Sequence, residues 1–461
     1  MHNDPGSFRD PAGIVLCPDN KIYRTVTEYG AEQYEFVKKS GLYEELTGQN
    51  LLVPFREVDK KSVNFEFSSR TRYLLELQKL DFISYPYEWS FSALRQAALA
   101  HLKIHLLALT KGVTLSDATA YNIQFTGTRA IFIDQLSFRR YVDGELWYGH
   151  RQFCEQFLNP LLLRILCGIS HHAWCRSSLE GITASDLNSL LPWYKKISPE
   201  VFFHVTLHAW LQQKHHHQKP VDIKSRKLPI TAFRSMLVQL QDWIGGLKAP
   251  EQKSVWTDYS SNTIYDSEET ATKKEFVRNY TASVKPRVIW DLGCNTGEYT
   301  VCCLEAGAKK SIGFDADPDV VDMAYLNARK KNLQFLPLYM DFTNPSPSQG
   351  WGEKERGGLS RRQKPDGLLA LALLHHLVIG RNIPLHEAVN RIIDLAPTGV
   401  IEFIPKNDPM VKTLLFYKHD IFPDYTEQNF MSIVCRRAKV VSEKYLTGEG
   451  RKLVFYSRPG S

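Results

Sequence analysis

The stretch from Val288 to Thr300 constrains the fold of this chain more than any other, and it reads Val-Ile-Trp-Asp-Leu-Gly-Cys-Asn-Thr-Gly-Glu-Tyr-Thr. Its first three residues predict a short buried strand, which Asp291 ends. Gly293, Asn295 and Gly297 then predict a tight turn, because glycine and asparagine tolerate a left-handed backbone. A helix is expected from about Glu298. Strand, glycine turn and helix together form the nucleotide-binding corner of open α/β sheets, where ligands lie at the carboxyl ends of strands.

The chemistry of this turn indicates which ligand it suits. A dinucleotide places its pyrophosphate at the helix N-terminus, on a Gly-x-Gly-x-x-Gly run. Here Glu298 stands at the third glycine position, and its carboxylate repels a diphosphate. S-adenosylmethionine (SAM) carries a sulfonium and an amino group and no phosphate. The next predicted strand, 311–315, ends in Asp315, whose carboxylate can accept hydrogen bonds from both ribose hydroxyls.

These residues resemble motif I and the following acidic motif of the class I SAM-dependent methyltransferases, over roughly residues 255–461. The resemblance implies a Rossmann-like domain with a seven-stranded mixed sheet, whose last two strands we expect at 431–441 and 451–457. It also implies that Asp341, at the end of the strand 334–340, binds the adenine amino group, with Phe342 packed near the ring. The cofactor-binding residues expected from it are Asp291, Gly293, Cys294, Asn295, Gly297, Asp315, Ala316, Asp341 and Phe342. We interpret Cys294 as a small filler of the loop and not as a nucleophile.

Candidate catalytic residues follow the next two predicted strands. The apolar run 367–374 predicts a strand buried on both faces, and it leads into His375 and His376. Either histidine could take a proton from the methyl acceptor. The alternative is that one packs against the methionine part of SAM and the other caps a helix. Strand alternation favours His376 as the acceptor-side residue. Glu402 lies inside the buried strand 400–404 and therefore needs a partner or a ligand.

Three segments resemble a bacterial subgroup of methyltransferase-fold proteins that includes the nodulation-associated NoeA-type proteins. They are 375–378, 401–406 and 422–430, which read His-His-Leu-Val, Ile-Glu-Phe-Ile-Pro-Lys and Phe-Pro-Asp-Tyr-Thr-Glu-Gln-Asn-Phe. In that subgroup the methyltransferase fold carries a large N-terminal extension. The likeness indicates the fold more than the acceptor, which we expect to be a small or carrier-bound molecule.

The N-terminal half contains a second motif. A helix predicted from Ser90 to about Thr110 is followed by Asp117, by Asn122 five residues later, and by a strand 130–134 that ends in Asp134. This order resembles the protein-kinase-like fold in its small-molecule phosphotransferase branch. The resemblance implies Asp117 as the catalytic acid, Asn122 and Asp134 as metal ligands, and Mg²⁺ with ATP as cofactors.

The same half departs from that pattern in several places. Ser116 precedes Asp117, Gln135 follows Asp134, and no glycine-rich phosphate loop precedes Ile22. Lys21 and Arg24 are both candidates for the nucleotide-binding cation, with Glu28, Glu32 or Glu35 as its helix partner. We therefore expect a degenerate module that positions a substrate or partner.

Composition and patterning bound the remaining possibilities. The formal charge of +7 over 461 residues does not argue for a nucleic-acid partner. The cysteine spacing indicates reduced thiols, and no apolar run predicts a membrane span, so we expect a cytoplasmic protein. His171, His172 and Cys175 have metal-ligand side chains but no fourth ligand in register, which favours a packed helix. The Gly- and Pro-flanked segment 245–253 predicts a junction between domains 1–245 and 246–461.

Three functions are compatible with these observations. The first is a SAM-dependent methyltransferase in which the N-terminal module positions the acceptor or a partner. The second is a non-enzymatic SAM-binding scaffold, and the third is a bifunctional kinase–methyltransferase. The glycine turn, the spaced acids and the histidine pair favour the first. The sequence does not define the oligomeric state.

Overall fold

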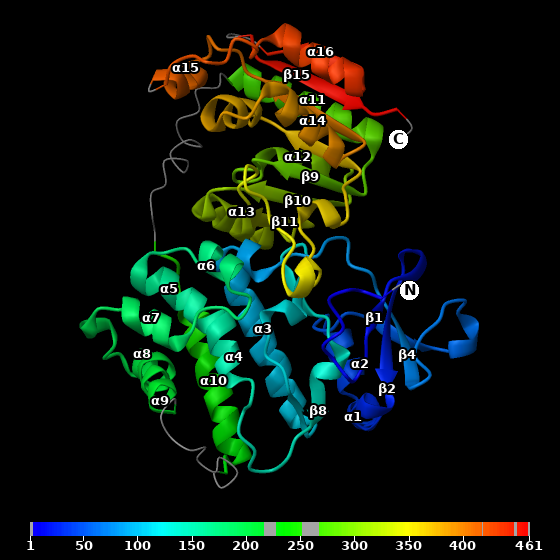
Figure 1. Cartoon of the computed structure of the whole chain (residues 1–461), viewed down its shortest axis with the longest axis vertical. Helices are drawn as coiled ribbons and strands as arrows, with labels where there is room; N and C mark the ends of the chain where they lie inside the picture. The colour runs from blue at the N-terminus through cyan, green and yellow to red at the C-terminus, as the bar shows by residue number, and fades with distance from the viewer. Residues whose placement is uncertain (1–2, 216–226, 251–266, 417, 447–449, 460–461) are drawn as a thin grey trace. The chain divides into compact units, whose positions relative to one another are not determined.

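The computed structural model describes residues 3–215, 227–250, 267–416, 418–446 and 450–459 (Figure 1). Its contacts divide the chain into two compact units. Unit 1 comprises Met1–Glu251 together with Ser348–Gly357, and unit 2 comprises Gln252–Pro347 and Gly358–Ser461. The predicted junction at 245–253 adjoins this boundary, and its part from residue 251 onward lies outside the described residues. In the described part of the chain, no helix is long and apolar enough to cross a membrane.

Unit 1 begins with an antiparallel sheet of order β1-β2-β4-β3. Its strands are β1 Val15–Leu16, β2 Ile22–Thr27, β3 Phe55–Val58 and β4 Thr71–Leu77. Helices α1 (Glu28–Lys39) and α2 (Leu42–Gly48) connect β2 to β3. The predicted cation Arg24 thus lies on β2, and the candidate glutamates lie on the helix that follows it.

The rest of unit 1 is mainly helical and is organised around α3 (Phe91–Thr110). The Ser90 side chain caps this helix by accepting a hydrogen bond from the Ala93 amide at 3.2 Å. Two hairpin-like pairs follow, β5 Val113–Leu115 with β8 Phe138–Arg140, and β6 Ile123–Thr126 with β7 Arg129–Phe132. Further helices are α4 His150–Phe153, α5 Asn159–Cys167, α6 His172–Ser177, α7 Ala184–Leu190, α8 Pro199–Val201, α9 Leu207–His215 and α10 Ile230–Gly246. Two π-helical segments lie among them, η6 Cys154–Leu158 and η8 Phe202–Thr206.

Unit 2 contains a seven-stranded sheet of order β11-β10-β9-β12-β13-β15-β14. The strands are β9 Val288–Leu292, β10 Lys310–Asp315, β11 Phe335–Tyr339, β12 Gly367–Ala370, β13 Thr398–Phe403, β14 Lys439–Tyr445 and β15 Lys452–Ser457. The first five are parallel, and β15 runs antiparallel to both β13 and β14. Chain order reverses on the two sides of β9, so β9 and β12 flank the point where ligands bind in open α/β sheets.

The helices of unit 2 cover this sheet. They are α11 Ser267–Val284, α12 Glu298–Glu305, α13 Pro318–Lys330, α14 Leu385–Leu395, α15 Pro409–Phe416 and α16 Glu427–Arg437. Val277 and Tyr280 of α11 and Cys303 of α12 share one core cluster with Leu369 of β12 and Val400 of β13. Helices α11 and α12 therefore pack on the same sheet face, beside the glycine turn.

Two sequence predictions differ from the structure here. Residues 431–437, predicted as part of a strand, form the end of α16, because the Thr426 side chain caps that helix at the Asn429 amide and Phe430, Ile433 and Val434 form its buried face. The strand predicted to run from 367 to 374 ends at Ala370. Ala372 then adopts a left-handed φ of 49°, and a helical turn carries the histidine pair.

Candidate functional site

The glycine turn of unit 2 follows β9 at the carboxyl edge of the sheet. Gly293, Asn295 and Gly297 have φ values of 75°, 48° and 87°, all in the left-handed region. A Cβ at Gly297 would lie 2.4 Å from Cε1 of Phe335, so no larger residue fits without displacing that ring. The turn therefore has to be built from residues that tolerate this backbone, and it brings the start of α12 close to the ends of β9 and β10.

A carboxylate lies at or near the carboxyl end of each of three strands at this edge. Asp315 ends β10, and its two oxygens accept hydrogen bonds from the amides of Asn295, at 2.9 Å, and Asp317, at 3.0 Å. Asp341 follows β11 and accepts from the Thr343 amide at 2.9 Å and its hydroxyl at 2.7 Å. Asp291 lies within β9 and accepts from the Thr300 hydroxyl at 2.5 Å. Burial raises the pKa of Asp291 to about 6 and also raises that of Asp315.

A cavity of about 1200 Å³ opens at this edge, entirely within unit 2. Ten of the twelve predicted cofactor and catalytic residues of this unit line it, namely Asp291, Gly293, Cys294, Asn295, Asp315, Ala316, Asp341, Phe342, His375 and His376. The other two do not line it: Gly297 belongs to the turn, and Glu402 lies in β13 with no exposed surface. Six carboxylates and three cationic side chains line the cavity, so its wall is acidic. Such a wall favours a ligand with positive charge over one with a diphosphate.

One carboxylate of this wall, Glu298, is in a different electrostatic state from the one expected from the sequence. Glu298, expected to repel a diphosphate, forms an ion pair with Lys274 at 2.6 Å. Its charge is partly compensated, and the acidic character of the cavity depends more on Asp315, Asp317 and Asp341.

The histidine pair lies in the helical turn that follows β12, and both residues line the cavity. The two rings have centroids 4.1 Å apart. His375 is 1% exposed, and its Nδ1 has no hydrogen-bond partner among the described residues. Burial lowers the pKa of both imidazoles. Both are therefore neutral near pH 7 and can accept a proton. Because the two residues lie in a helical turn, strand alternation does not distinguish them.

Two buried ion pairs at this site were not predicted from the sequence. Lys273 Nζ of α11 lies 2.5 Å from Glu402 Oε2, which also accepts a hydrogen bond from the Ala372 amide at 2.8 Å. Arg451 Nε donates to Asp408 Oδ2 at 2.6 Å. Lys273 and Arg451 both line the cavity. The signal for Lys273 was its place four residues before Val277 on the buried stripe of α11, where a lysine needs a counter-charge.

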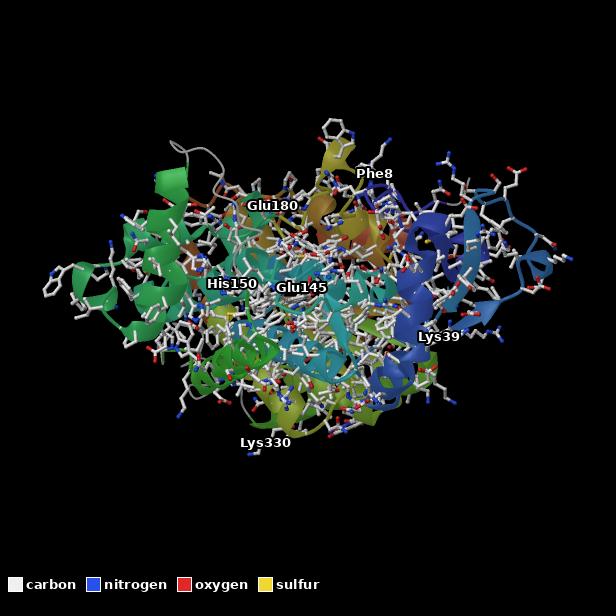
Figure 2. All side chains as sticks on the ribbon, turned by 90° about the horizontal axis from the view of Figure 1, so that it is seen from below. Phe8, Lys39, Glu145, His150, Glu180 and Lys330 are labelled. Carbon is white, nitrogen blue, oxygen red and sulfur yellow. The ribbon has the colours of Figure 1, made fainter. Side chains whose placement is uncertain are left out.

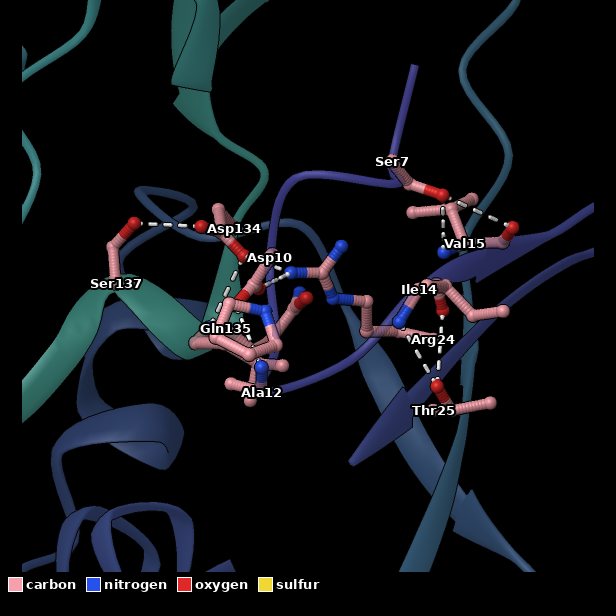
Figure 3. A network of polar contacts seen from close by, with 12 residues as sticks. Ser7, Asp10, Ala12, Ile14, Val15, Arg24, Thr25, Asp134, Gln135 and Ser137 are labelled. Carbon is pink, nitrogen blue, oxygen red and sulfur yellow. Dashed lines mark hydrogen bonds and ion pairs between the residues drawn. The ribbon is translucent and has the colours of Figure 1, made fainter. Parts of the chain in front are cut away.

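Unit 1 brings the kinase-like residues together in a separate polar network, and Figure 3 shows its part around Arg24, Asp134 and Ser137. The Arg24 guanidinium contacts Asp10 and lies 3.4 Å from Asp134 Oδ1. The other oxygen of Asp134 accepts from the Ser137 hydroxyl at 2.6 Å. Asn122 Nδ2 donates to that hydroxyl at 3.1 Å and to Asp117 Oδ2 at 3.3 Å. Asp117, Asn122 and Asp134 are thus joined in one network, and burial raises the pKa of Asp117.

The structure distinguishes between the two candidate cations of this network. Lys21 pairs with Glu76 at 3.3 Å, whereas Arg24 is the cation beside Asp134. The helix glutamates have other partners, since Glu28 pairs with Arg72 and Glu35 accepts from the Tyr73 hydroxyl at 2.6 Å. Asp10, which precedes the sheet, occupies the role that a glutamate of α1 was expected to have.

Strand order and site together define unit 2 as a domain of the class I methyltransferase type. No protein-family model matches the chain. The chain is 45% identical over 457 residues to nodulation protein NoeA of Rhizobium meliloti strain 1021, which covers 98% of this chain and 95% of that protein. It therefore belongs to the family of nodulation protein NoeA.

Other likenesses cover a smaller part of the chain. A stretch of 64 residues is 31% identical to the ribosomal protein L11 methyltransferase of Hamiltonella defensa, covering 14% of this chain and 21% of that protein. Among solved structures, the N-methyltransferase NodS from Bradyrhizobium japonicum WM9 is 13% identical, with a TM-score of 0.32 over 42% of this chain and 98% of that one. The magnesium protoporphyrin IX methyltransferase from Synechocystis PCC 6803 is 14% identical, with a TM-score of 0.31 over 48% of this chain and 94% of that one.

Proposed function

We propose that this protein is a SAM-dependent methyltransferase whose acceptor is a small or carrier-bound molecule. The observation that carries this proposal is the left-handed Gly–Asn–Gly turn placed among three carboxylates at the ends of β9, β10 and β11. The name of the full-length relative, nodulation protein, supports a role for this chain in the same process.

The residues of the cavity fit SAM in chemistry and sign. Asp315 would accept from the ribose hydroxyls, and Asp341 with Phe342 would hold the adenine. The acidic wall complements a sulfonium and an ammonium group. Among the described residues that line it, the cations are Lys273, Arg381 and Arg451, and each of them already has a carboxylate partner. When bound, SAM supplies an activated methyl group.

The acceptance of the proton and the positioning of the residue that accepts it fall to side chains after β12 and in β13. His376, neutral near pH 7, would accept the proton of an acceptor hydroxyl or amine. Glu402 is held by Lys273 and by the Ala372 amide, so we assign it a positioning role: it fixes the left-handed turn at Ala372, which precedes the histidines.

Calorimetry with the full-length protein tests the cofactor part of this proposal. SAM should bind, and SAM with a radiolabelled methyl group should label a component of small-molecule or carrier-lipid fractions from bacterial cells. Binding without labelling of any fraction would favour the scaffold function. Absence of SAM binding by the folded protein would refute both.

For unit 1 we propose a degenerate kinase-like module that positions the acceptor or a partner. The order of its elements supports this. The cation-bearing strand β2 is followed by two helices, two strands, the long helix α3 and the Asp117–Asn122–Asp134 segment, and we take the first of the two helices as the one expected in that fold. Arg24 neutralises Asp134, and we propose that a divalent cation or its ATP complex would have to compete with the Arg24 guanidinium. This competition makes phosphoryl transfer the weaker alternative.

A further inference from the structure

Unit 1 contains a cluster of four metal-ligand side chains remote in sequence from the kinase-like network. They are His150, Cys154, His204 and His208. The candidate ligand atoms of the first three all lie within 4.8 Å of one another, and Cys154 Sγ is 3.7 Å from His150 Nε2. The His208 ring is 4.9 Å from the His150 ring, and the His204 ring is 5.6 Å from it, as centroid distances. His150 is labelled in Figure 2.

The spacing of these residues suits a single ion. His150 and Cys154 are four residues apart, and so are His204 and His208, and such pairs share one helix face. Each helix therefore presents two ligands toward the other. A π-helical segment begins at Cys154, and a second one, 202–206, contains His204. Segments of this kind are rare and are often found at functional sites.

The surroundings of the cluster are apolar, with Cys154 buried and the three histidines partly buried. Cys154 is 4% exposed, the Trp147 ring lies 5.4 Å from that of His150, and the Trp243 ring stacks on His204 at 5.7 Å. His204 Nδ1 is buried and has no hydrogen-bond partner among the described residues. An orphaned ring nitrogen in such a place costs free energy unless a ligand satisfies it.

A second histidine and cysteine group in the same unit provides the contrast. His171, His172 and Cys175 also occur together, as the sequence suggested. Their ring nitrogens already have backbone partners, with His171 Nε2 at 3.2 Å from the Pro86 carbonyl and His172 Nε2 at 3.0 Å from that of Trp89. Those histidines are explained by packing, and the cluster at Cys154 is not.

We propose that His150, Cys154, His204 and His208 form a binding site for a zinc-class divalent cation. Imidazole nitrogen and thiolate sulfur are the ligands that Zn²⁺ prefers in four-coordinate tetrahedral sites, whereas Mg²⁺ requires oxygen ligands. Binding replaces the S–H proton of Cys154 by a sulfur–metal bond and releases that proton to solvent. The ion would fasten the α4–η6 stretch to the η8–α9 stretch.

Ionisation of the free side chains is consistent with this site. Burial lowers the pKa of His150 to about 3 and that of His204 to about 4, so both imidazoles are neutral at pH 7 with a lone pair available. Burial raises the pKa of the Cys154 thiol, so its deprotonation has to come from the metal.

The test uses the full-length protein after removal of metal by a chelator. Wild type should retain or regain about one zinc per chain, and Co²⁺ as a probe should give the charge-transfer absorption of a thiolate–metal bond. Cys154→Ser should abolish that absorption and weaken affinity by at least about tenfold, and His204→Gln should weaken affinity similarly. Cys175→Ser, which removes another buried thiol of the same unit, should leave both unchanged.

Three outcomes would overturn the proposal. The first is a wild-type protein that takes up neither Zn²⁺ nor Co²⁺ in stoichiometric amount, a result that refutes the site before any variant is made. Charge-transfer absorption that persists in Cys154→Ser, or is lost in Cys175→Ser, would place the site elsewhere. Chelation should also lower the melting temperature of the wild type, and it should lower that of Cys154→Ser by less. SAM binding serves as the check that unit 2 of each variant is folded.

Discussion

Lys273 Nζ lies 2.5 Å from Glu402 Oε2, both side chains are shielded from solvent, and Lys273 lines the cavity of unit 2. The two residues come from a helix that precedes the sheet and from its fifth strand. The same carboxylate oxygen accepts the Ala372 amide, so the pair connects α11, β13 and the turn before the histidines.

Because both charges of this pair are buried, we expect that removing one of them lowers the stability of the protein strongly. Lys273→Met should lower the free energy of unfolding by about 3–5 kcal/mol, because Glu402 is left as an uncompensated buried charge. The double variant Lys273→Met/Glu402→Gln should recover much of this loss, since the amide oxygen still accepts from Ala372 without a charge. Chemical denaturation of the four proteins of this cycle measures the coupling. A cost below about 1 kcal/mol for the single variant would show that the pair has no structural role.

Asp315 predicts a selective loss of cofactor affinity. Asp315→Ala should weaken SAM binding by roughly 1–3 kcal/mol, the cost of losing charge-assisted hydrogen bonds. Glu305→Ala is the matched control, because Glu305 is an exposed acid at the end of α12 and does not line the cavity. Calorimetry should show near-normal binding for the control, and equal binding by both variants would argue against Asp315 as the ribose ligand.

We expect the two histidines to affect different properties, His376 the turnover and His375 the stability. Once an acceptor is known, His376→Ala should lower kcat and leave SAM affinity nearly unchanged. His375→Ala should mainly destabilise the protein, because His375 is 1% exposed and its removal leaves a cavity. The pH profile provides a second readout. A base must be deprotonated to act, and burial lowers the pKa of His376, so activity should fall only below about pH 6.5, the ordinary histidine value. A profile with no acid limb in the wild type would remove His376 as the base.

Much of unit 2 could be predicted because its signals are local. The glycine turn and the acids at strand ends are read from spacing within single segments, and the structure places them around one cavity. The partner of Lys273 could not be read in this way, since the sequence indicates a lysine on an apolar stripe but not which distant acid meets it. Ala372 gave no signal either, because alanine does not favour the left-handed backbone that ends β12 early. The end of α16 was predicted as a strand because a short apolar run such as Ile433 and Val434 fits a buried strand and the buried face of a helix equally well.

Unit 1 was less predictable for a related reason. The spacing of Asp117, Asn122 and Asp134 indicated a shared site, and the structure joins them. The ion pair with Arg24 and the contribution of Asp10 depend on how the N-terminal segment packs against β2. A charged residue on a short strand does not reveal its partner, so the sequence left Lys21 and Arg24 equally open.

A buried histidine of unit 1 predicts how stability depends on pH. His101 lies among Phe132, Phe153 and Phe157, and neither of its ring nitrogens has a hydrogen-bond partner in the described part of the chain. Burial lowers its pKa to about 3. The unfolded state therefore binds a proton at higher pH than the folded state, and stability falls as pH drops below about 6.5.

His101→Leu should remove this dependence at one site. The variant should be more stable than wild type by about 1 kcal/mol at pH 7, the cost of an unsatisfied buried polar group, and by more at pH 5. Melting curves between these pH values measure the difference. His386→Leu, at an exposed histidine, is the control and should leave the pH slope unchanged. A difference that does not widen on acidification would contradict the assignment.

The ion pair between Arg24 and Asp134 predicts how unit 1 responds to divalent cations. In the wild type the guanidinium occupies the position beside Asp134 that a metal would need. Arg24→Ala leaves the carboxylates of Asp10 and Asp134 without that counter-charge, next to Asn122. Mn²⁺, alone or with ATP, should therefore raise the melting temperature of the variant more than that of the wild type. An ion at about 100 times its dissociation constant adds roughly 2.7 kcal/mol of stability. Adding Asp134→Ala to the variant should cancel the extra response. Equal responses of wild type and Arg24→Ala would show that the guanidinium does not compete with a cation, and no response in either would leave the Asp117–Asn122–Asp134 network without a metal function.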